Sequence, residues 1–546
     1  MVLNIAGHAR PRKRRRAGGA AQEVSCCMLL WLPWRAAVTP DRLALVAPDG
    51  ARLSYAGLHA RADDVASRLA GLGMRAGDRV AVMLPNGAEI AAVAHAAMRT
   101  GAVLLPLNLR LTTAEQAWQV TDAGARLLVF ASSTAHAAAE VRERAPGLEL
   151  VSVDGDVAHD FTPLADVVPA ENTALRYRAR PDEPLAILYT SGTTGSPKGA
   201  ILTYANFWWS AIGSALNLGV HEDDRWLAPM PLFHVGGLSV LTRSAIQGTA
   251  AIVHDGFDAE HVSDAIDEER VTLVSLVPTM LGRLLDARGG RPFPSSLRCV
   301  LLGGGPAPRP LLERCAALGV PVSQTYGLTE ACSQVATLAP ADALRRLGSA
   351  GRPLYPTELR VARDDGADAA AGEAGEILVR GPTVTPGYWN RPDATARALR
   401  DGWLHTGDAG MLDDEGYLYV LDRRDDLVVS GGENVYPAEV EGALLAHPEV
   451  VEAAVVGVPD DEWGQRVAAL VRVTGDAVTP DALRAFCRER IARYKVPAEL
   501  RITRDALPRN AAGKLLRREV RREFEVRWGA DAQSEVEGRK SGDPGV

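Results

Sequence analysis

Cysteine is scarce in this chain, and its placement argues against a metal-stabilised fold. The 546 residues include 6 cysteines, and none of them forms a Cys-x-x-Cys pair or has the spacing of zinc ligands. The pattern is typical of reduced thiols, which predicts a cytoplasmic protein.

A long apolar run and an excess of positive charge are also missing. No stretch of about 18 uncharged apolar residues occurs, so we predict no membrane span. The formal net charge is −8, and outside residues 1–27 the chain holds 54 basic and 67 acidic residues. This balance argues against nucleic acid as a principal partner. Local donors must then hold any anionic ligand, because no overall positive field is present.

The two ends of the chain differ from the rest. Residues 1–27 combine the basic run "RPRKRRR" with a short apolar region that Glu23 interrupts, and no clear signal-peptide cleavage site follows. We interpret this segment as a disordered basic leader, or as a mis-assigned start with translation beginning at Met28. The polar residues 526–546 are predicted to form a disordered tail.

The apolar pattern between these ends indicates an α/β protein of more than one domain. Helical spacing over residues 54–73 precedes a strand-like run at 78–85, and the alternation recurs, which predicts mainly parallel sheets. Residues 71–76 match the dinucleotide-binding fingerprint, but they follow a helix and precede a strand, so we interpret them as a helix-ending turn. After a stretch of short strands that begins near residue 403, the pattern becomes α+β, and we predict domains at 28–424 and 425–525.

The most informative stretch is "YTSGTTGSPKG", which begins at Tyr189 directly after a short apolar run. Its glycines allow the backbone to approach a ligand closely, and its hydroxyls and lysine can surround phosphate oxygens. It is not a P-loop, because Pro197 stands where that motif needs glycine. We interpret it as a phosphate-binding loop, with a flexible linker as the alternative. The candidate phosphate-binding residues are Thr190, Ser191, Gly192, Thr193, Thr194, Gly195 and Lys198.

Further stretches carry residue types suited to a nucleotide. "LLGGGPAP" offers close backbone approach, and "VSQTYGLTEACSQ" places an aromatic ring, a hydroxyl and a carboxylate within five residues. "LHTGDAG" supplies a carboxylate for ribose hydroxyls. Each stretch alone is equally consistent with an ordinary turn or a surface side chain. The candidates are Gly304, Gly305, Tyr326, Thr329, Glu330, Asp408, Arg423, the pair Gly431 and Gly432, and Lys514.

Taken in order, these stretches resemble the core motifs of the adenylate-forming superfamily, which includes acyl-CoA synthetases, peptide adenylation domains and luciferases. The resemblance covers residues 28 to 525. It implies a large N-terminal domain of stacked, mainly parallel sheets with helices plus a distorted barrel, followed by a small mobile α+β C-terminal domain. It also implies ATP, Mg²⁺ and coenzyme A, the last as co-substrate. Segments such as "LNLRLTTAEQAWQ" and "CVLLGGGPAPRPLLERC" resemble, more narrowly, the 2-succinylbenzoate–CoA ligases of menaquinone biosynthesis.

The resemblance also implies a role for each candidate residue. The loop would hold the β- and γ-phosphates, with Thr194 and Glu330 at the metal. Lys514 would bridge the substrate carboxylate and the α-phosphate as the principal catalytic residue. The remaining implied roles are α-phosphate contact for Thr329, adenine stacking for Tyr326, ribose binding for Asp408 and Arg423, hinge for Asp425, and lining of the CoA tunnel for Gly431 and Gly432.

Two further residues bear on the acid substrate. His234, in "PLFHVGG", is expected to line the acyl pocket by resemblance, as a catalytic and substrate residue. Arg243 is proposed to hold a second carboxylate, and a surface or helix-end arginine is the equally weighted alternative.

The resemblance favours an ATP-dependent 2-succinylbenzoate–CoA ligase that forms an acyl-adenylate and then the thioester with CoA. Three functional alternatives remain open from the sequence. They are a ligase for medium-chain fatty or other aryl acids, a stand-alone adenylation enzyme that loads a carrier protein, and a non-catalytic nucleotide-binding relative. The expected partner is a small carboxylic acid, and the oligomeric state is left open, a homo-oligomer included.

Overall fold

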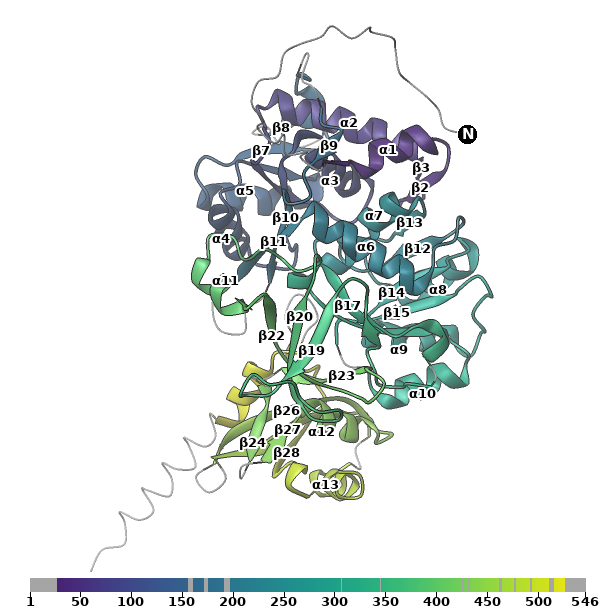
Figure 1. Cartoon of the computed structure of the whole chain (residues 1–546), viewed down its shortest axis with the longest axis vertical. Coiled ribbons are helices and arrows are strands. Elements are labelled where there is room, and N and C mark those ends of the chain that lie inside the picture. The colour runs from purple at the N-terminus through teal and green to yellow at the C-terminus, as the bar shows by residue number, and fades with distance from the viewer. Residues whose placement is uncertain are drawn as a thin grey trace, which may run out of the picture.

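Strand β4 (Arg79–Met83) illustrates how this sequence builds layers. Val80 and Val82 enter one apolar core, whereas Ala81 and Met83 enter another on the opposite side. Side chains alternate between the two faces of a strand, so a strand that is apolar at every position must be covered on both faces. In the computed structural model (Figure 1), helices provide that cover.

The structure describes twelve segments of the chain, and the statements below refer to them. They are residues 27–155, 161–170, 175–190, 197–305, 307–343, 345–423, 426–430, 433–460, 464–475, 478–491, 493–509 and 515–525. The predicted leader, residues 1–27, lies outside them except for Cys27, and the predicted tail at 526–546 lies outside them entirely.

Two large sheets form the core of the chain's first part. The first has seven strands in the order β11-β10-β5-β4-β6-β7-β8, parallel except for the hairpin of β10 and β11. The second has nine strands in the order β18-β17-β16-β15-β14-β12-β13-β2-β3, with parallel strands at its centre. The strands not yet given are β2 (Leu43–Val46), β3 (Arg52–Ser54), β5 (Val103–Pro106), β6 (Leu127–Phe130), β7 (Glu149–Ser152), β8 (Thr162–Pro163), β10 (Pro184–Thr190), β11 (Lys198–Thr203), β12 (Arg225–Ala228), β13 (Ala250–Val253), β14 (Leu273–Leu276), β15 (Cys299–Leu302), β16 (Val322–Leu328), β17 (Ser333–Thr337) and β18 (Arg352–Pro353).

Helices fill the space between these sheets and cover their outer faces. One apolar core joins residues of both sheets to five helices, so these helices lie between the sheets. Two further cores place α4 and α5 on the outer face of the first sheet and α8 to α10 on that of the second. The inner helices are α1 (Trp31–Val38), α2 (Tyr55–Gly71), α3 (Ala88–Thr100), α6 (Tyr204–Leu218) and α7 (Val235–Gln247); the outer ones are α4 (Thr113–Ala123), α5 (Ala135–Arg144), α8 (Ala259–Glu268), α9 (Pro278–Arg288) and α10 (Arg309–Ala317).

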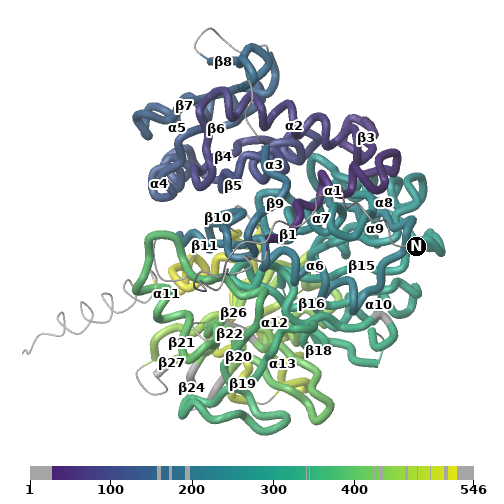
Figure 2. The backbone as a smooth tube through the Cα atoms, turned by 45° about the horizontal axis from the view of Figure 1, so that its top comes forward, coloured from purple at the N-terminus to yellow at the C-terminus, as the bar shows by residue number. Residues whose placement is uncertain are grey.

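The chain then enters two smaller sheets, which occupy the lower part of Figure 1 and of the tilted view in Figure 2. An antiparallel five-stranded sheet stands where the distorted barrel was expected, and a second five-stranded sheet with helices forms the C-terminal part. The first contains β19 (Glu358–Ala362), β20 (Gly375–Arg380), β21 (Leu399–Arg400), β22 (Trp403–Leu412) and β23 (Leu418–Arg423), with α11 (Pro392–Ala398) beside it. The second contains β24 (Val428–Ser430), β25 (Glu433–Val435), β26 (Val450–Asp460), β27 (Gly464–Val473) and β28 (Glu499–Thr503), with α12 (Pro437–Leu445), α13 (Pro480–Arg488) and a last helix at 517–525. A short pair, β1 (Met28–Leu29) and β9 (Arg178–Ala179), completes the set.

The α/β fold class predicted from the sequence is confirmed. Helix α2 begins after Ser54, whose hydroxyl accepts a hydrogen bond from the Gly57 amide at 3.1 Å, and it ends at Gly71. Gly73 follows with a φ of 78°, so residues 71–76 form the helix-ending turn that we predicted. Within the described residues, no helix has the length and apolarity that crossing a membrane requires. The domain boundary near residue 424 stays a prediction.

Candidate functional site

A cavity of about 460 Å³ opens at the carboxyl ends of β15 and β16, where ligands of open α/β sheets commonly bind. Its walls come from three parts of the chain: the nine-stranded sheet, the antiparallel sheet and the C-terminal part. The lining residues are Leu302, Gly304, Gly305, Ala307, Gln324, Thr325, Tyr326, Gly327, Gly348, Ala350, Asp408, Val420, Leu421, Tyr436, Ala438, Glu439 and Arg517.

The two residues predicted for adenine and ribose lie together in this cavity. The Tyr326 hydroxyl donates a hydrogen bond to Oδ2 of Asp408 at 2.7 Å, across 82 positions of sequence. Asp408 on β22 is also the direct Cα partner of Arg423 on β23. An aromatic ring and a carboxylate are therefore held together in the cavity, with the backbone of Arg423 beside Asp408, and their roles toward adenine and ribose stay predictions.

Glycines permit the tight backbone geometry of this wall. Gly304 has a φ of 80°, and a Cβ there would lie 3.0 Å from Val277. Gly327 lies so close to the next strand that a Cβ would stand 1.6 Å from the Ser333 carbonyl oxygen. The close pairing of β16 with β17 brings the short helix Thr329–Ala331 to the tip of the hairpin, so both candidate residues of "LTE" project from one tight turn.

Glu330 is positioned by residues that the sequence motifs did not indicate. Its Oε1 accepts a hydrogen bond from the Tyr388 hydroxyl at 2.8 Å, and its carbonyl oxygen accepts one from the Thr385 amide at 2.7 Å. Oε2 has no hydrogen-bond partner among the described residues, which leaves it able to bind a cation. In the same part of the chain no cluster of three or more metal-ligating side chains occurs. One carboxylate together with nucleotide phosphates is a common way for proteins to bind Mg²⁺, so this donor set fits the ion.

The ends of the phosphate-binding loop are described, but its centre is not. Thr190 ends β10 and faces Lys198, the first residue of β11, as its antiparallel partner. Nζ of Lys198 lies 5.5 Å from the centre of the Tyr388 ring. Ser191, Gly192, Thr193, Thr194 and Gly195 lie outside the described residues, as do Asp425, Gly431, Gly432 and Lys514. The roles assigned to them stay predictions.

His234 occupies the position immediately before α7, and its surroundings explain the sequence "PLFHVGG". The Asn86 side chain fixes this segment, since its amide group donates to the Met230 carbonyl at 3.0 Å and accepts from the Leu232 amide at 2.9 Å. Gly237 packs on the segment, because a Cβ there would lie 2.3 Å from the Pro231 carbonyl oxygen. The segment is thus fixed by both a side chain and the close approach of two backbones.

The His234 imidazole is neutral at physiological pH. Burial is the main cause and the nearby charge of Arg110 the smaller one, and together they lower its pKa to about 4. Its Nε2 is buried without a hydrogen-bond partner among the described residues. A neutral ring with an unsatisfied nitrogen can accept a hydrogen bond from, or donate one to, a ligand that enters beside α7.

Arg243 lies in the core, so the surface or helix-end alternative is wrong. Only 2% of the residue is exposed, and its guanidinium carbon lies 4.6 Å from the centre of the Trp226 ring. Nε and Nη2 are buried without a hydrogen-bond partner in the described structure. Burial lowers the pKa to about 10, which keeps the group positive at pH 7. Nine residues span about 13.5 Å of helix, so Arg243 does not lie directly beside His234, and neither residue lines the 460 Å³ cavity.

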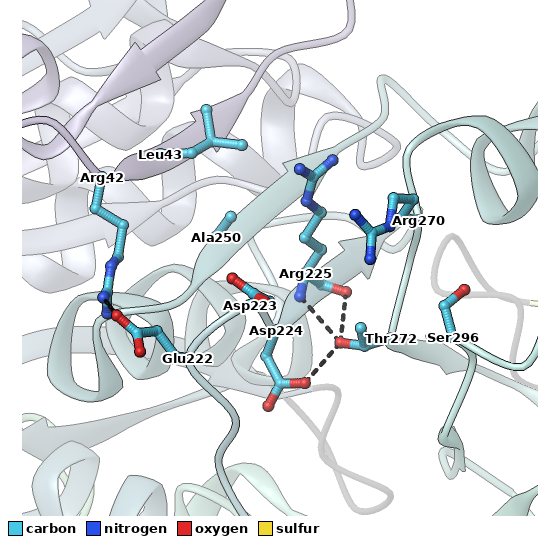
Figure 3. A pocket seen from close by; sticks show the side chains of 10 residues that line it. All are labelled: Arg42, Leu43, Glu222, Asp223, Asp224, Arg225, Ala250, Arg270, Thr272 and Ser296. Carbon is cyan, nitrogen blue, oxygen red and sulfur yellow. Dashed lines mark hydrogen bonds and ion pairs between the residues drawn. The ribbon is translucent and has the colours of Figure 1, made fainter.

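A second pocket, of about 390 Å³, lies at the opposite edge of the nine-stranded sheet (Figure 3). Its central polar groups bond to each other: Thr272 donates to Asp224 at 2.8 Å and accepts from the Arg225 amide at 2.9 Å. Glu222 pairs with Arg42 on its rim. These contacts fasten the amino ends of neighbouring strands, and this pocket contains none of the predicted site residues.

Sequence reasoning missed several residues at or near the site. The sequence motifs did not indicate four of them. Tyr388 donates a hydrogen bond to Glu330, Tyr436 and Arg517 line the cavity, and the charge of Arg110 contributes to the lowered pKa of His234. The aromatic pair in "TPGYWNRP" was the one available signal for Tyr388. It follows no helical or strand periodicity, so nothing in the local pattern tied it to Glu330.

With this geometry in view, the class of protein is clear: the chain belongs to the AMP-binding enzymes. The model of the AMP-binding enzyme family matches residues 32–389, and that of the AMP-binding enzyme C-terminal domain matches residues 439–514. A 2-succinylbenzoate–CoA ligase of Geobacillus kaustophilus is 50% identical over 495 residues, which are 90% of this chain and 97% of the relative.

Solved structures agree with this relationship. An o-succinylbenzoate CoA synthetase of Bacillus subtilis, in complex with the acyl-adenylate intermediate, is 42% identical with a TM-score of 0.84, over 90% of this chain and 98% of that one. The same Bacillus subtilis enzyme in complex with ATP and magnesium ion is 42% identical with a TM-score of 0.83, over 90% of this chain and 99% of that one.

Proposed function

We propose that this protein is an AMP-forming 2-succinylbenzoate–CoA ligase of menaquinone biosynthesis, located in the cytoplasm. The observation that carries the proposal is 50% identity to a ligase of that name across 97% of its length. The cavity supports it, because Tyr326, Asp408, Gly304 and Gly305 line one wall at the carboxyl edge of the sheet. The buried Cys299, Cys315, Cys332 and Cys487 are free thiols, which is consistent with a reducing compartment.

The reaction has two steps, and each builds negative charge. A substrate carboxylate oxygen attacks the α-phosphorus of ATP, and pyrophosphate leaves, which gives an acyl-adenylate. The thiol of coenzyme A then loses its proton and attacks the acyl carbon, and AMP leaves with the electrons of the broken C–O bond. Preorganised donors dominate such catalysis, because they stabilise charge on phosphorus-bound oxygens and on the tetrahedral oxyanion.

Different candidate residues would bind the adenine, the ribose, the phosphates and the metal ion of Mg·ATP. Tyr326 would stack on adenine, Asp408 and Arg423 would hold the ribose, and Thr329 would contact the α-phosphate. Mg²⁺, when bound, neutralises phosphate charge, and Glu330 would hold it with Thr194. The loop from Thr190 to Lys198 would bind the β- and γ-phosphates, and its Pro197, which has no N–H, suits a loop that changes position.

The C-terminal part would serve both steps in turn. Lys514 would bridge the carboxylate and the α-phosphate during adenylation. Rotation about Asp425 would then withdraw Lys514 and bring Gly431 and Gly432 to the path of the thiol. Such domain closure about a hinge at the end of an element is a common device in enzymes with two half-reactions.

The substrate carries two carboxylates, and only one of them is activated. Arg243 would hold the other, since two of its nitrogens are buried without partners among the described residues. A buried guanidinium without a counterion is costly, and an incoming carboxylate would relieve that cost.

The test compares acids with the purified protein. Pyrophosphate release and CoA consumption are followed with 2-succinylbenzoate, benzoate and a medium-chain fatty acid. With 2-succinylbenzoate we expect ATP-dependent pyrophosphate release and CoA consumption. Both rates should be about tenfold or more above those with benzoate or the fatty acid. Fast turnover of the fatty acid with none of 2-succinylbenzoate would overturn the proposed substrate. Pyrophosphate release without CoA consumption would favour the carrier-loading alternative.

A further inference from the structure

The segment Thr385–Arg391, which we name the brace, joins three parts of the site that are far apart in sequence. It runs alongside β11, the strand that leaves the phosphate-binding loop. The Ile201 amide donates to the Gly387 carbonyl at 3.0 Å, and the Trp389 amide donates to the Gly199 carbonyl at 2.8 Å. The brace is therefore fastened by backbone hydrogen bonds to one root of the loop.

The same segment holds the hairpin that carries Glu330. The Thr385 amide donates to the Glu330 carbonyl oxygen at 2.7 Å, while the Thr385 hydroxyl donates to the Ile201 carbonyl oxygen at 2.6 Å. One residue of the brace thus bonds both the hairpin and β11. Their relative position is fixed through Thr385.

The brace also reaches the other root of the loop. Arg391 forms an ion pair with Asp122 at 2.5 Å. The second oxygen of that carboxylate accepts a hydrogen bond at 2.6 Å from Tyr189, the residue before Thr190. Both ends of the phosphate-binding loop are consequently tied to residues 387–391.

Tyr388 lies at the centre of these contacts and faces two charged groups of the site. Its hydroxyl donates to Oε1 of Glu330 at 2.8 Å, and the centre of its ring lies 5.5 Å from Nζ of Lys198. A hydrogen bond to one carboxylate oxygen orients the other toward a ligand, in the way that outer partners orient metal ligands. A ring face near an ammonium attracts it electrostatically.

We propose that Tyr388 is a positioning residue that sets Glu330 for Mg²⁺ and Lys198 for the ATP phosphates at the same time. This inference rests on the proposed function, in which Glu330 holds the metal of Mg·ATP. Tyr388 touches neither reacting atom, and it acts through the two charged groups on either side of it. The brace keeps this arrangement in register with the loop.

The experiment measures ATP binding by calorimetry, with Mg²⁺ and with EDTA, on the full chain. Tyr388→Phe removes the hydroxyl and keeps the ring. We expect the gain in ATP affinity that Mg²⁺ provides to fall by about tenfold or more, the usual effect of losing an outer partner of a metal ligand. ATP affinity in EDTA should stay within about twofold, because the ring still faces Lys198.

Tyr388→Leu removes the ring as well. We expect the same loss of the magnesium gain and, in addition, a fall of about two- to fivefold in ATP affinity in EDTA. A merely structural role would weaken binding equally with and without Mg²⁺.

Tyr417 provides a matched control. Its hydroxyl donates to Asp342 at 2.7 Å and the Arg346 guanidinium lies 4.7 Å from its ring centre, yet it does not line the nucleotide cavity. Tyr417→Phe should keep the full magnesium gain. An equal gain in Tyr388→Phe and Tyr417→Phe would overturn the inference.

Glu330→Gln separates this inference from the proposed function on which it rests. A lost magnesium gain in Glu330→Gln, with an intact gain in Tyr388→Phe, would refute the role of Tyr388 alone. An intact magnesium gain in Glu330→Gln would refute the metal role of Glu330. The role of Tyr388 in positioning Glu330 for Mg²⁺ would then be refuted as well. Because ATP binding needs no acid, neither outcome depends on which acid the enzyme activates.

Discussion

At the scale of single residues, the buried groups define how the protein responds to pH. Burial lowers the pKa of His95, which lies within α3, from the ordinary 6.5 to about 4. The unfolded chain therefore takes up a proton at this residue below pH 6.5, whereas the folded chain does so only near pH 4. Stability is full above pH 6.5 and falls as the pH drops toward 4, because protons favour the unfolded state.

The lowered pKa of His95 predicts how His95→Leu will behave. From pH 7.5 to 5.5 the wild-type free energy of unfolding should fall by about 1.4 kcal/mol through His95, and the variant should lack that part of the fall. Urea unfolding at the two pH values measures the difference. Parallel pH dependences in wild type and His95→Leu would contradict the prediction.

A second prediction at this scale concerns Arg243. Arg243→Met keeps much of the volume and leaves no charge behind in the core, so we expect the protein to fold. The KM for 2-succinylbenzoate should rise by about 10- to 100-fold, which corresponds to the loss of one charge-assisted hydrogen bond. The KM for ATP should change by less than about twofold. Steady-state kinetics with each substrate varied in turn test this, and an unchanged KM for the acid would exclude Arg243 from the substrate pocket.

At the scale of elements, the hairpin of β16 and β17 shows how a glycine permits a functional turn. Gly327→Ala would place a methyl group 1.6 Å from the Ser333 carbonyl oxygen, so the two strands must separate. We expect a loss of about 2 kcal/mol or more in stability, as for other overpacked sites, together with weaker binding of Mg·ATP. Gly282→Ala on α9 is the control, since a Cβ there meets nothing within 4 Å and helix propensity should slightly stabilise the protein. Thermal unfolding and calorimetric ATP titration give the two readouts, and an unaltered Gly327→Ala protein would show that the hairpin is free to relax.

Single helices and strands could be predicted from the sequence, whereas contacts between elements of different sheets could not. The apolar run at 78–85 predicts a strand and the helical spacing over 54–73 predicts a helix, and the structure has β4 at Arg79–Met83 and α2 at Tyr55–Gly71. Tyr326 and Asp408 were selected as nucleotide residues, but their hydrogen bond joins strands of two different sheets. Pairing of that kind depends on how sheets pack, which no local pattern encodes. The same applies to Tyr388, which meets Glu330 across 58 positions of sequence.

At the scale of the whole molecule, the 460 Å³ cavity belongs to no single part of the chain. The C-terminal part contributes four of the lining residues, Tyr436, Ala438, Glu439 and Arg517. Arg517 is held within that part by Glu441 at 2.8 Å and by Asp426 at 3.4 Å. Movement of the C-terminal part as a body would therefore change this wall of the cavity at once. A single site could then serve two reactions in sequence.

The last prediction separates these two reactions through Lys514, which lies three positions before Arg517 in the sequence. If Lys514 stabilises the charge that develops during adenylation, Lys514→Ala should lower ATP-dependent pyrophosphate release by about 100-fold or more, as removal of one preorganised donor does. The same variant should convert preformed acyl-adenylate and CoA to the thioester at a rate within about threefold of wild type, since the proposal withdraws this lysine before the second step. Arg484→Ala is the control, because Arg484 pairs with Asp481 on α13, neither residue lines the cavity, and Arg484 has no proposed role in adenylation. It should keep both rates within about threefold. Equal loss of both half-reactions in Lys514→Ala would mean that the lysine supports the fold of the C-terminal part or both chemical steps, and the division of labour proposed for the moving domain would be wrong.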